Sequence, residues 1–228
     1  MRLFKAIRRF VKYARLWTFQ WLLAPVSRRS RRKRMKRFVE IMGVKAHDRI
    51  LDLGGHPEIW SFVDIPLDIT ILNLPGAILA RGSALHRIAY VEGDACDVKG
   101  YARGDFDIVY SNSVIEHVGA RTKQVDFATV VRRLSSRFWV QTPAKWFPIE
   151  AHCGMPFWWF YPAAVRKWML RRWRQKLPAW TDMVEGTTVI EKTFLKQLFG
   201  NAHIYTERLI GIPKSYTAWS NDSGGRGQ

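Results

Sequence analysis

The chain has 228 residues, of which 47% are hydrophobic, and this is enough for one globular domain with appendages. Its formal net charge of +18 favours partners that carry negative charge, such as phosphates or anionic lipids. Its only two cysteines, Cys96 and Cys153, exclude a disulfide framework and indicate a reducing compartment such as the cytosol.

Most of the positive charge lies in residues 1–40, which hold fourteen of the 37 Lys and Arg residues and one of the 19 acids. Apolar residues recur every three or four positions over residues 3–22, with cations on the opposite side. We therefore predict a basic amphipathic N-terminal extension over residues 1–44 whose helix lies on an anionic membrane surface. Packing on the domain itself and nucleic-acid binding are the alternatives. The apolar stretch is too short for a transmembrane span.

The segment 28–37 contains eight basic residues in ten. It is either a solvated linker that leads into a helix at 38–42, or a patch that binds phosphates. Lipid head groups and RNA both present phosphates, so the segment does not distinguish them.

Five short apolar segments follow, separated by helical or loop stretches, at 49–55, 69–74, 88–95, 106–118 and 138–143. This alternation predicts an α/β fold with a mostly parallel sheet and helices on both faces. A helix at 189–199 and two strands near 204–210 and 215–219 end the domain, and a polar tail at 221–228 is predicted to be disordered.

The first of these segments ends in Asp52, Leu53, Gly54 and Gly55. A buried parallel strand ends in this way where it turns sharply into a loop that binds a nucleoside. Glycine at such a turn lets the backbone approach a ligand closely.

Taken in order, the motifs resemble those of the class I S-adenosylmethionine-dependent methyltransferases over residues 46–220. The segment 52–55 resembles the first cofactor motif, 93–95 the adenine motif and 106–118 the fourth-strand motif. The loop 142–152 and the ending 207–215 resemble a subgroup with a TPxxxFPIExH loop after strand five. The resemblance implies a Rossmann-like seven-stranded sheet over residues 45–220, mostly parallel, with a C-terminal antiparallel hairpin.

The same resemblance implies S-adenosylmethionine as the cofactor. Its binding residues would be Asp52, Gly54 and Gly55 in the first loop, Asn73 at the ribose, Asp94 and Ala95 at the adenine, and Asn112 beside the methionine moiety. The chain departs from the family at His56 and Glu58, where glycines are usual. It departs again at Asn73, where a carboxylate usually holds the ribose more strongly.

Glu150 and His152 follow the fifth predicted strand, and a carboxylate beside an imidazole suits acid/base catalysis. His117 follows the fourth strand and is a candidate for the acceptor pocket. A structural turn, capping or packing is the alternative for these residues. No metal is expected, because cysteine and histidine are scattered and Ser113 stands where an acidic partner of Glu116 and His117 would be needed.

Residues 153–181 form an aromatic and basic insertion, with a helix predicted after Pro162 that buries Val165, Met169, Trp173 and Leu177 on one face. In this family, insertions after strand five lie near the acceptor, which suggests a lid. Its aromatic side chains could stack bases, meet lipid, or form ordinary core.

We therefore expect methyl transfer from S-adenosylmethionine to a small or lipid-linked acceptor. The protein would be cytoplasmic and peripheral on the inner face of the membrane. An RNA methyltransferase is one alternative, and a non-catalytic cofactor-binding scaffold or membrane adaptor is another.

Overall fold

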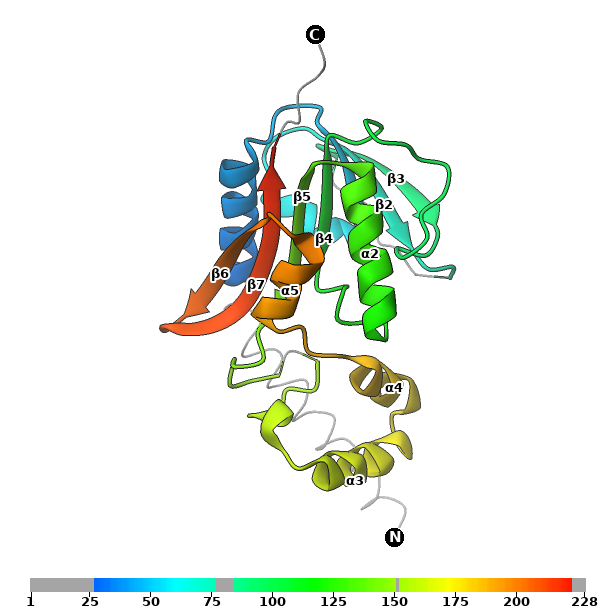
Figure 1. Cartoon of the computed structure of the whole chain (residues 1–228), viewed down its shortest axis with the longest axis vertical. Coiled ribbons are helices and arrows are strands. Elements are labelled where there is room, and N and C mark those ends of the chain that lie inside the picture. The colour runs from blue at the N-terminus through cyan, green and yellow to red at the C-terminus, as the bar shows by residue number, and fades with distance from the viewer. Residues whose placement is uncertain (1–26, 77–83, 151, 223–228) are drawn as a thin grey trace.

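A computed structural model of the chain describes residues 27–76, 84–150 and 152–222 (Figure 1). The amphipathic helix predicted at 3–22 and most of the predicted tail lie outside the described residues. One seven-stranded sheet has the order β3-β2-β1-β4-β5-β7-β6. Its strands are β1 (Arg49–Leu53), β2 (Asp68–Asn73), β3 (Arg87–Glu92), β4 (Ile108–Asn112), β5 (Arg137–Pro143), β6 (His203–Leu209) and β7 (Ile212–Asn221).

Strands β1 to β5 are parallel, whereas β7 runs antiparallel between β5 and β6. The predicted fold class, a mostly parallel sheet with a C-terminal antiparallel hairpin, is confirmed. Two predicted boundaries differ. Strand β4 ends at Asn112, because the chain turns at Ser113 with a φ of 59°. Strand β7 continues through Asn221, which was predicted to begin the tail.

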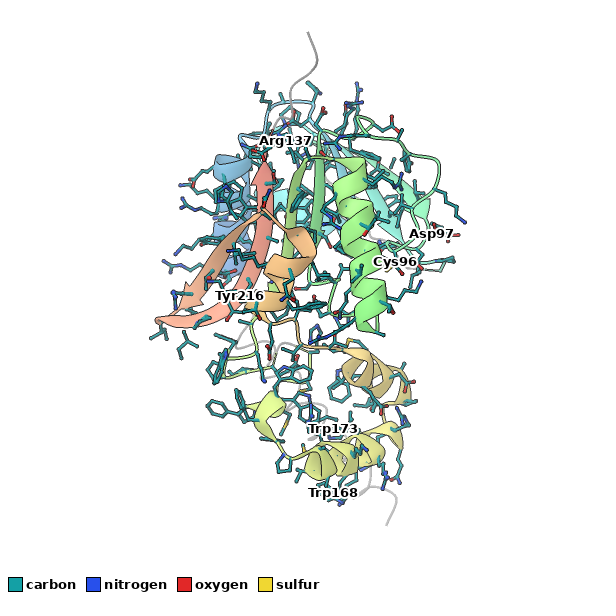
Figure 2. All side chains as sticks on the ribbon, in the orientation of Figure 1. Cys96, Asp97, Arg137, Trp168, Trp173 and Tyr216 are labelled. Carbon is teal, nitrogen blue, oxygen red and sulfur yellow. The ribbon has the colours of Figure 1, made fainter. Side chains whose placement is uncertain are left out.

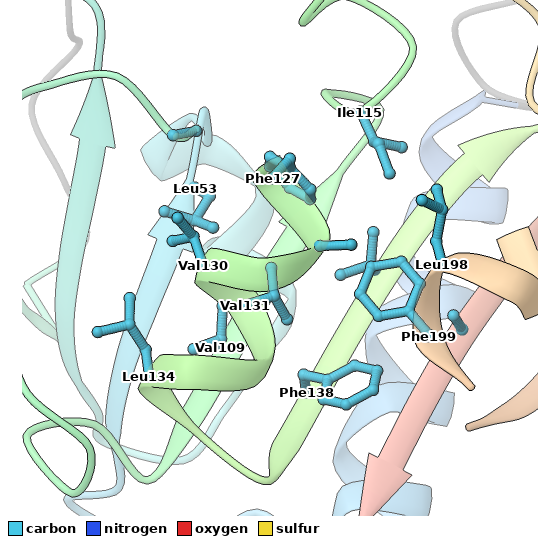
Figure 3. Close-up of a cluster of buried hydrophobic side chains, with 14 of the residues drawn as sticks. Leu53, Val109, Ile115, Phe127, Val130, Val131, Leu134, Phe138, Leu198 and Phe199 are labelled. Atoms are coloured by element: carbon cyan, nitrogen blue, oxygen red, sulfur yellow. The ribbon is translucent and has the colours of Figure 1, made fainter. Parts of the chain in front are cut away.

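One face of the sheet is covered by α2 (Arg121–Leu134) and α5 (Lys192–Phe199). Side chains alternate along each strand, so Leu51, Leu53 and Val109 point to this face and are buried. Figure 3 shows Phe127, Val131 and Leu134 of α2 packing onto them. Both faces of the central strands β1, β4 and β5 are covered, so these strands are almost continuously buried, whereas the edge strand β3 is mostly exposed.

The opposite face is covered by a helix over residues 27–42 and by the 3-10 helix η1 (Pro57–Phe62). Met35, Phe38 and Met42 are fully buried there, and the Phe38 ring meets the Tyr110 ring edge to face at 5.0 Å. The basic segment 28–37 is therefore helical and not a linker. Apolar residues of the helix 27–42 recur every three or four positions at Met35, Phe38 and Met42 and anchor the helix in the core.

The insertion forms η2 (Trp158–Phe160), α3 (Ala163–Arg174) and α4 (Pro178–Gly186), beyond the carboxyl ends of β4 and β5 (Figure 1). It has a small core of its own, in which the indole rings of Trp158 and Trp173 stack at 5.3 Å. The predicted α3 helix ends before Leu177, because Pro178 starts a second helix that the sequence analysis missed. Val165, expected on the buried face, is exposed.

Among the described residues, no helix is both long enough and apolar enough to cross a bilayer.

Candidate functional site

The first predicted motif forms a tight turn at the carboxyl end of β1. Asp52 alternates with Leu51 and Leu53, so its carboxylate points to the face covered by η1, where it is fully buried. Its Oδ2 accepts a hydrogen bond from Trp60 Nε1 at 2.9 Å. Burial raises the pKa of Asp52 to about 7, against the opposing effect of that bond. Asp52 thus joins the end of β1 to Trp60 of η1 and packs against the turn at Gly55.

The two glycines are required by close packing. Gly54 has a φ of +70°, and an added Cβ would lie 2.7 Å from Val114 Cγ2. A Cβ at Gly55 would lie 1.8 Å from Asp52 Oδ2. His56, which stands where the resemblance would place a second glycine, caps η1 by accepting from Glu58 N at 3.3 Å. A 3-10 helix therefore follows β1 here.

Asn73 and Asp94 end the next two strands on the same edge of the sheet. The Asn73 amide donates to Gly55 O at 2.9 Å, so it holds the first turn, which a carboxylate at this position could not do. Asp94 follows β3, is exposed, and accepts from Cys96 N at 2.8 Å. Ala95 is buried beside it. Three loops at the carboxyl ends of neighbouring strands thus lie along one edge.

Asn112, at the end of β4, joins a buried network that the sequence analysis missed. Its Oδ1 accepts from Arg34 Nη1 at 2.6 Å. The same guanidinium forms an ion pair with Glu207 of β6, with Nη2 and Oε2 2.9 Å apart. Arg34 lies on the apolar side of the helix 27–42, one residue from Met35 and four from Phe38, and this spacing was the available signal. Asn112 therefore has a structural partner in addition to any ligand.

The residues after β4 and β5 meet in one compact cluster, defined by Glu116, His117, Glu150 and His152. The Nε2 atoms of His117 and His152 are 2.9 Å apart. His152 Nδ1 is 2.7 Å from Glu150 Oε1, and Glu150 Oε2 accepts from the backbone amides of His152 and Cys153. The predicted Glu150–His152 pair therefore exists, and His117 adjoins it.

Burial and charge move the pKa values of these groups apart. Burial raises the pKa of Glu116 to about 7 and lowers the pKa of His117 to about 4. Burial would also lower the pKa of His152, but hydrogen bonding and attraction to Glu150 reverse this effect and raise it. The Glu150 pKa is lowered, because hydrogen bonds from His152 and Cys153 outweigh its burial. Groups perturbed in this way gather at sites that bind or transfer charge.

A small cleft adjoins the cluster. Glu116 and Glu150 form part of its wall, together with Lys145, Trp159 and Thr187 to Val189. Trp159 of the insertion thus lies beside two acids of the cluster, across a cleft that is narrow in this structure.

Comparisons with known proteins bear on the fold. No family model matches the sequence, and no curated protein does. Among solved structures, a protein of Pyrococcus horikoshii OT3 matches with a TM-score of 0.51 and 13% identity, over 82% of this chain and 87% of that chain. A chain of the complex between the Haloferax volcanii Trm112 methyltransferase activator and a methyltransferase matches with a TM-score of 0.50 and 10% identity, over 82% and 88%.

Haemonchus contortus phosphoethanolamine N-methyltransferase 2, solved with phosphomonomethylethanolamine and S-adenosylhomocysteine, also matches. The TM-score is 0.50 at 10% identity over 76% of this chain, which spans 38% of that enzyme. The chain has the class I methyltransferase fold. At these identities the similarity concerns the fold, and the activity of this chain has to be argued from its own residues.

Proposed function

We propose that the chain is an S-adenosylmethionine-dependent methyltransferase that acts on a small or lipid-linked acceptor. The observation that carries the proposal is that two different groups of residues lie side by side at the carboxyl ends of the parallel strands. The turn of Gly54, Gly55 and Asn73 lies at the ends of β1 and β2. The cluster of Glu116, His117, Glu150 and His152 follows β4 and β5. A donor and an acceptor could therefore meet between them.

The first group fits a nucleoside cofactor. At Gly54 and Gly55 the space that side chains would fill is taken by Val114 and Asp52, so the two glycines keep the turn tight at the carboxyl end of β1, where the cofactor would bind. Asn73 Oδ1 is suited to accept from a ribose hydroxyl, and the exposed Asp94 carboxylate from an adenine amino group. Bound S-adenosylmethionine would supply an electrophilic methyl group. Methyl transfer depends mainly on positioning, so these loops would supply much of the catalysis.

The second group fits the acceptor. Glu150 holds the His152 ring in a fixed orientation, and His152 contacts His117, so protons can be taken up within the cluster. Lys145 and Trp159 border Glu116 and Glu150 at the adjoining narrow cleft, so an acceptor bound over this cleft would lie next to the cluster. The proton that an acceptor hydroxyl or amine loses would pass to this cluster while the acceptor bonds to the methyl carbon.

Calorimetric titration with S-adenosylmethionine and S-adenosylhomocysteine tests the cofactor half of the proposal. Wild-type protein should bind both, and Asp94→Ala should weaken binding at least tenfold. Asp97→Ala is the matched control, because Asp97 is an exposed acid of the same loop that pairs with Lys99 at 3.1 Å. No binding by the wild type would contradict the proposal.

We further propose that the acceptor is met at an anionic membrane surface, from the cytoplasmic side. Support comes from the insertion, where Phe157 and Trp168 are each 57% exposed and Arg172 lies over the Trp168 ring at 5.0 Å. Figure 2 places Trp168 on α3, at the end of the molecule away from the sheet. Exposed aromatic rings beside cations suit an interface between acyl chains and head groups.

Flotation with phosphatidylglycerol vesicles tests the membrane proposal. Trp168→Glu should lower the bound fraction, whereas Val125→Glu on α2, another exposed apolar position, should not. Gel shifts with RNA form the second arm. Binding to RNA without flotation would favour the alternative of an RNA methyltransferase, since exposed aromatic rings also stack on bases.

A further inference from the structure

The contact between His117 and His152 joins two ring nitrogens, and it is a hydrogen bond only if one of the two carries a proton. Their Nε2 atoms are 2.9 Å apart, with the rings nearly perpendicular at 87°. A neutral imidazole carries one donor and one acceptor nitrogen, so the partners of the outer nitrogens decide what the inner pair presents.

Both outer nitrogens face acceptors. His152 Nδ1 lies 2.7 Å from Glu150 Oε1, so it donates to this carboxylate. His117 Nδ1 lies 3.3 Å from Thr187 Oγ1, and that hydroxyl donates its own hydrogen to Met183 O at 2.8 Å. Thr187 therefore accepts from His117. Each ring is thus protonated at Nδ1, and the two Nε2 lone pairs face one another.

Two facing lone pairs require a positive charge between or beside them. A proton shared by the two imidazoles would satisfy them, but it would leave the neighbouring carboxylate of Glu116 without a full set of hydrogen-bond partners. Glu116 is 1% exposed, and its Oε2 accepts from Thr142 Oγ1 at 3.1 Å. Its Oε1 has no hydrogen-bond partner among the described residues. A buried carboxylate oxygen without a partner is costly, and a cation at the cluster would remove that cost.

The separation of the nitrogens suits a metal ion. One ligand atom from each of Glu116, His117 and His152 lies within 4.8 Å of the other two. Two nitrogens bound about 2.0–2.1 Å from one ion at a right angle lie ~2.9 Å apart. Outer partners such as Glu150 and Thr187 are the groups that orient metal-bound histidines.

We propose that Glu116, His117 and His152 bind a divalent first-row transition-metal ion, with Glu150 and Thr187 as positioning residues. Two imidazoles and one carboxylate suit Mn²⁺, Co²⁺ or Zn²⁺ and leave coordination positions open. From the sequence no metal is expected, because Ser113 is not acidic. The third ligand comes instead from His152, after the next strand.

The role of the ion rests on the proposed function. With an ion bound, the two Nε2 atoms would be ligands and would not take up a proton. The ion would instead bind an acceptor through oxygen, such as a hydroxyl, and would make its proton easier to lose to water. The acceptor class then narrows to oxygen donors that can ligate a metal. The metal site itself depends only on the cluster and is tested without the cofactor.

The experiment uses full-length protein dialysed against chelator and then titrated with ZnCl₂ or MnCl₂ in a calorimeter, with CoCl₂ as a spectroscopic probe. We expect one ion per chain and visible cobalt absorption bands. Glu116→Gln and His117→Ala should each weaken zinc binding more than 100-fold. Glu150→Gln should weaken it 10- to 100-fold, as expected for a partner of a ligating histidine.

His203→Gln is the matched control, because His203 stacks on Trp219 at the sheet edge, far from the cluster in sequence. It should bind metal as the wild type does. Far-ultraviolet circular dichroism checks that each variant is folded, and Glu116→Gln keeps the side-chain shape if His117→Ala does not fold.

No stoichiometric binding by the wild type, or equal binding by a folded Glu116→Gln variant, would overturn the proposal. Metal binding in a protein that does not bind S-adenosylmethionine would support the metal site and contradict the proposed function.

Discussion

Arg34 and Glu207 form an ion pair across 173 residues of sequence, with both side chains about nine-tenths buried. The pair joins the helix 27–42 to β6, and Asn112 and Ser215 complete it with bonds of 2.6 and 3.0 Å. Loss of Arg34 would leave Glu207 buried with Lys214 as its remaining cation, 3.7 Å from Oε1, and such a loss from a buried pair is strongly destabilising.

Arg34→Ala should therefore lower the free energy of unfolding by about 3–5 kcal/mol. Arg37→Ala is the control. Arg37 lies one helical turn away and is half exposed, and its pairing with Glu40 at 3.3 Å contributes at most about 0.5 kcal/mol. Urea denaturation of the two variants measures the difference. A similar loss of unfolding free energy in both variants would show that the buried pair contributes no more to stability than the exposed pair.

Gly55→Ala should disrupt the turn after β1, because its Cβ would overlap the Asp52 carboxylate at 1.8 Å. We expect a loss of stability of about 3 kcal/mol or more, as for other overpacked cores. Gly186→Ala at the end of α4 meets nothing within 4 Å and should be close to neutral. Thermal melts compare the two, and equal melting temperatures would contradict the geometry at Gly55.

Asp52 should make stability depend on pH. Its pKa of about 7 in the folded state exceeds that of an unfolded aspartate, about 3.9. Between these values the folded state holds one more proton, so this residue's contribution to stability falls as pH rises. Asp52→Asn removes the titration. Relative to the wild type, its free energy of unfolding should improve by a few kcal/mol between pH 4.5 and pH 8.

Urea denaturation at several pH values measures that difference, with Asp97→Asn as an exposed control. A constant difference between Asp52→Asn and the wild type across this range would show that the Asp52 pKa is not raised.

Trp158→Ala should loosen the insertion and leave the sheet intact. Trp158 is 2% exposed and stacks on Trp173, within a small core separate from that of the sheet. Hydrogen exchange should speed up in α3 and α4 and stay slow in β1 and β4. Trp146→Ala, at a 61% exposed position, should change neither region. Faster exchange throughout would mean that the two cores are coupled.

The sequence predicted the central strands well because both faces of the sheet are covered there, so β1, β4 and β5 are short, buried segments. It did not reveal Arg34 as a buried residue, since one cation on the apolar side of a helix is hidden within a strongly basic segment. The contact between His117 and His152 depends on how two loops 35 residues apart approach each other. Local pattern carries no information about such a distance.

The position of β7 also constrains how the protein can be made. Its outer neighbour, β6, has no pairing partner until β7 bonds on one side to β5 and on the other to β6. Synthesis must therefore reach the end of β7 at Asn221 before the seven-stranded sheet is complete and before Glu207 is held beside Arg34. A ribosome-bound chain would hold its first five strands with one edge of β5 open. Stalled or prematurely ended translation products should then be recognised by chaperones and proteases as incomplete.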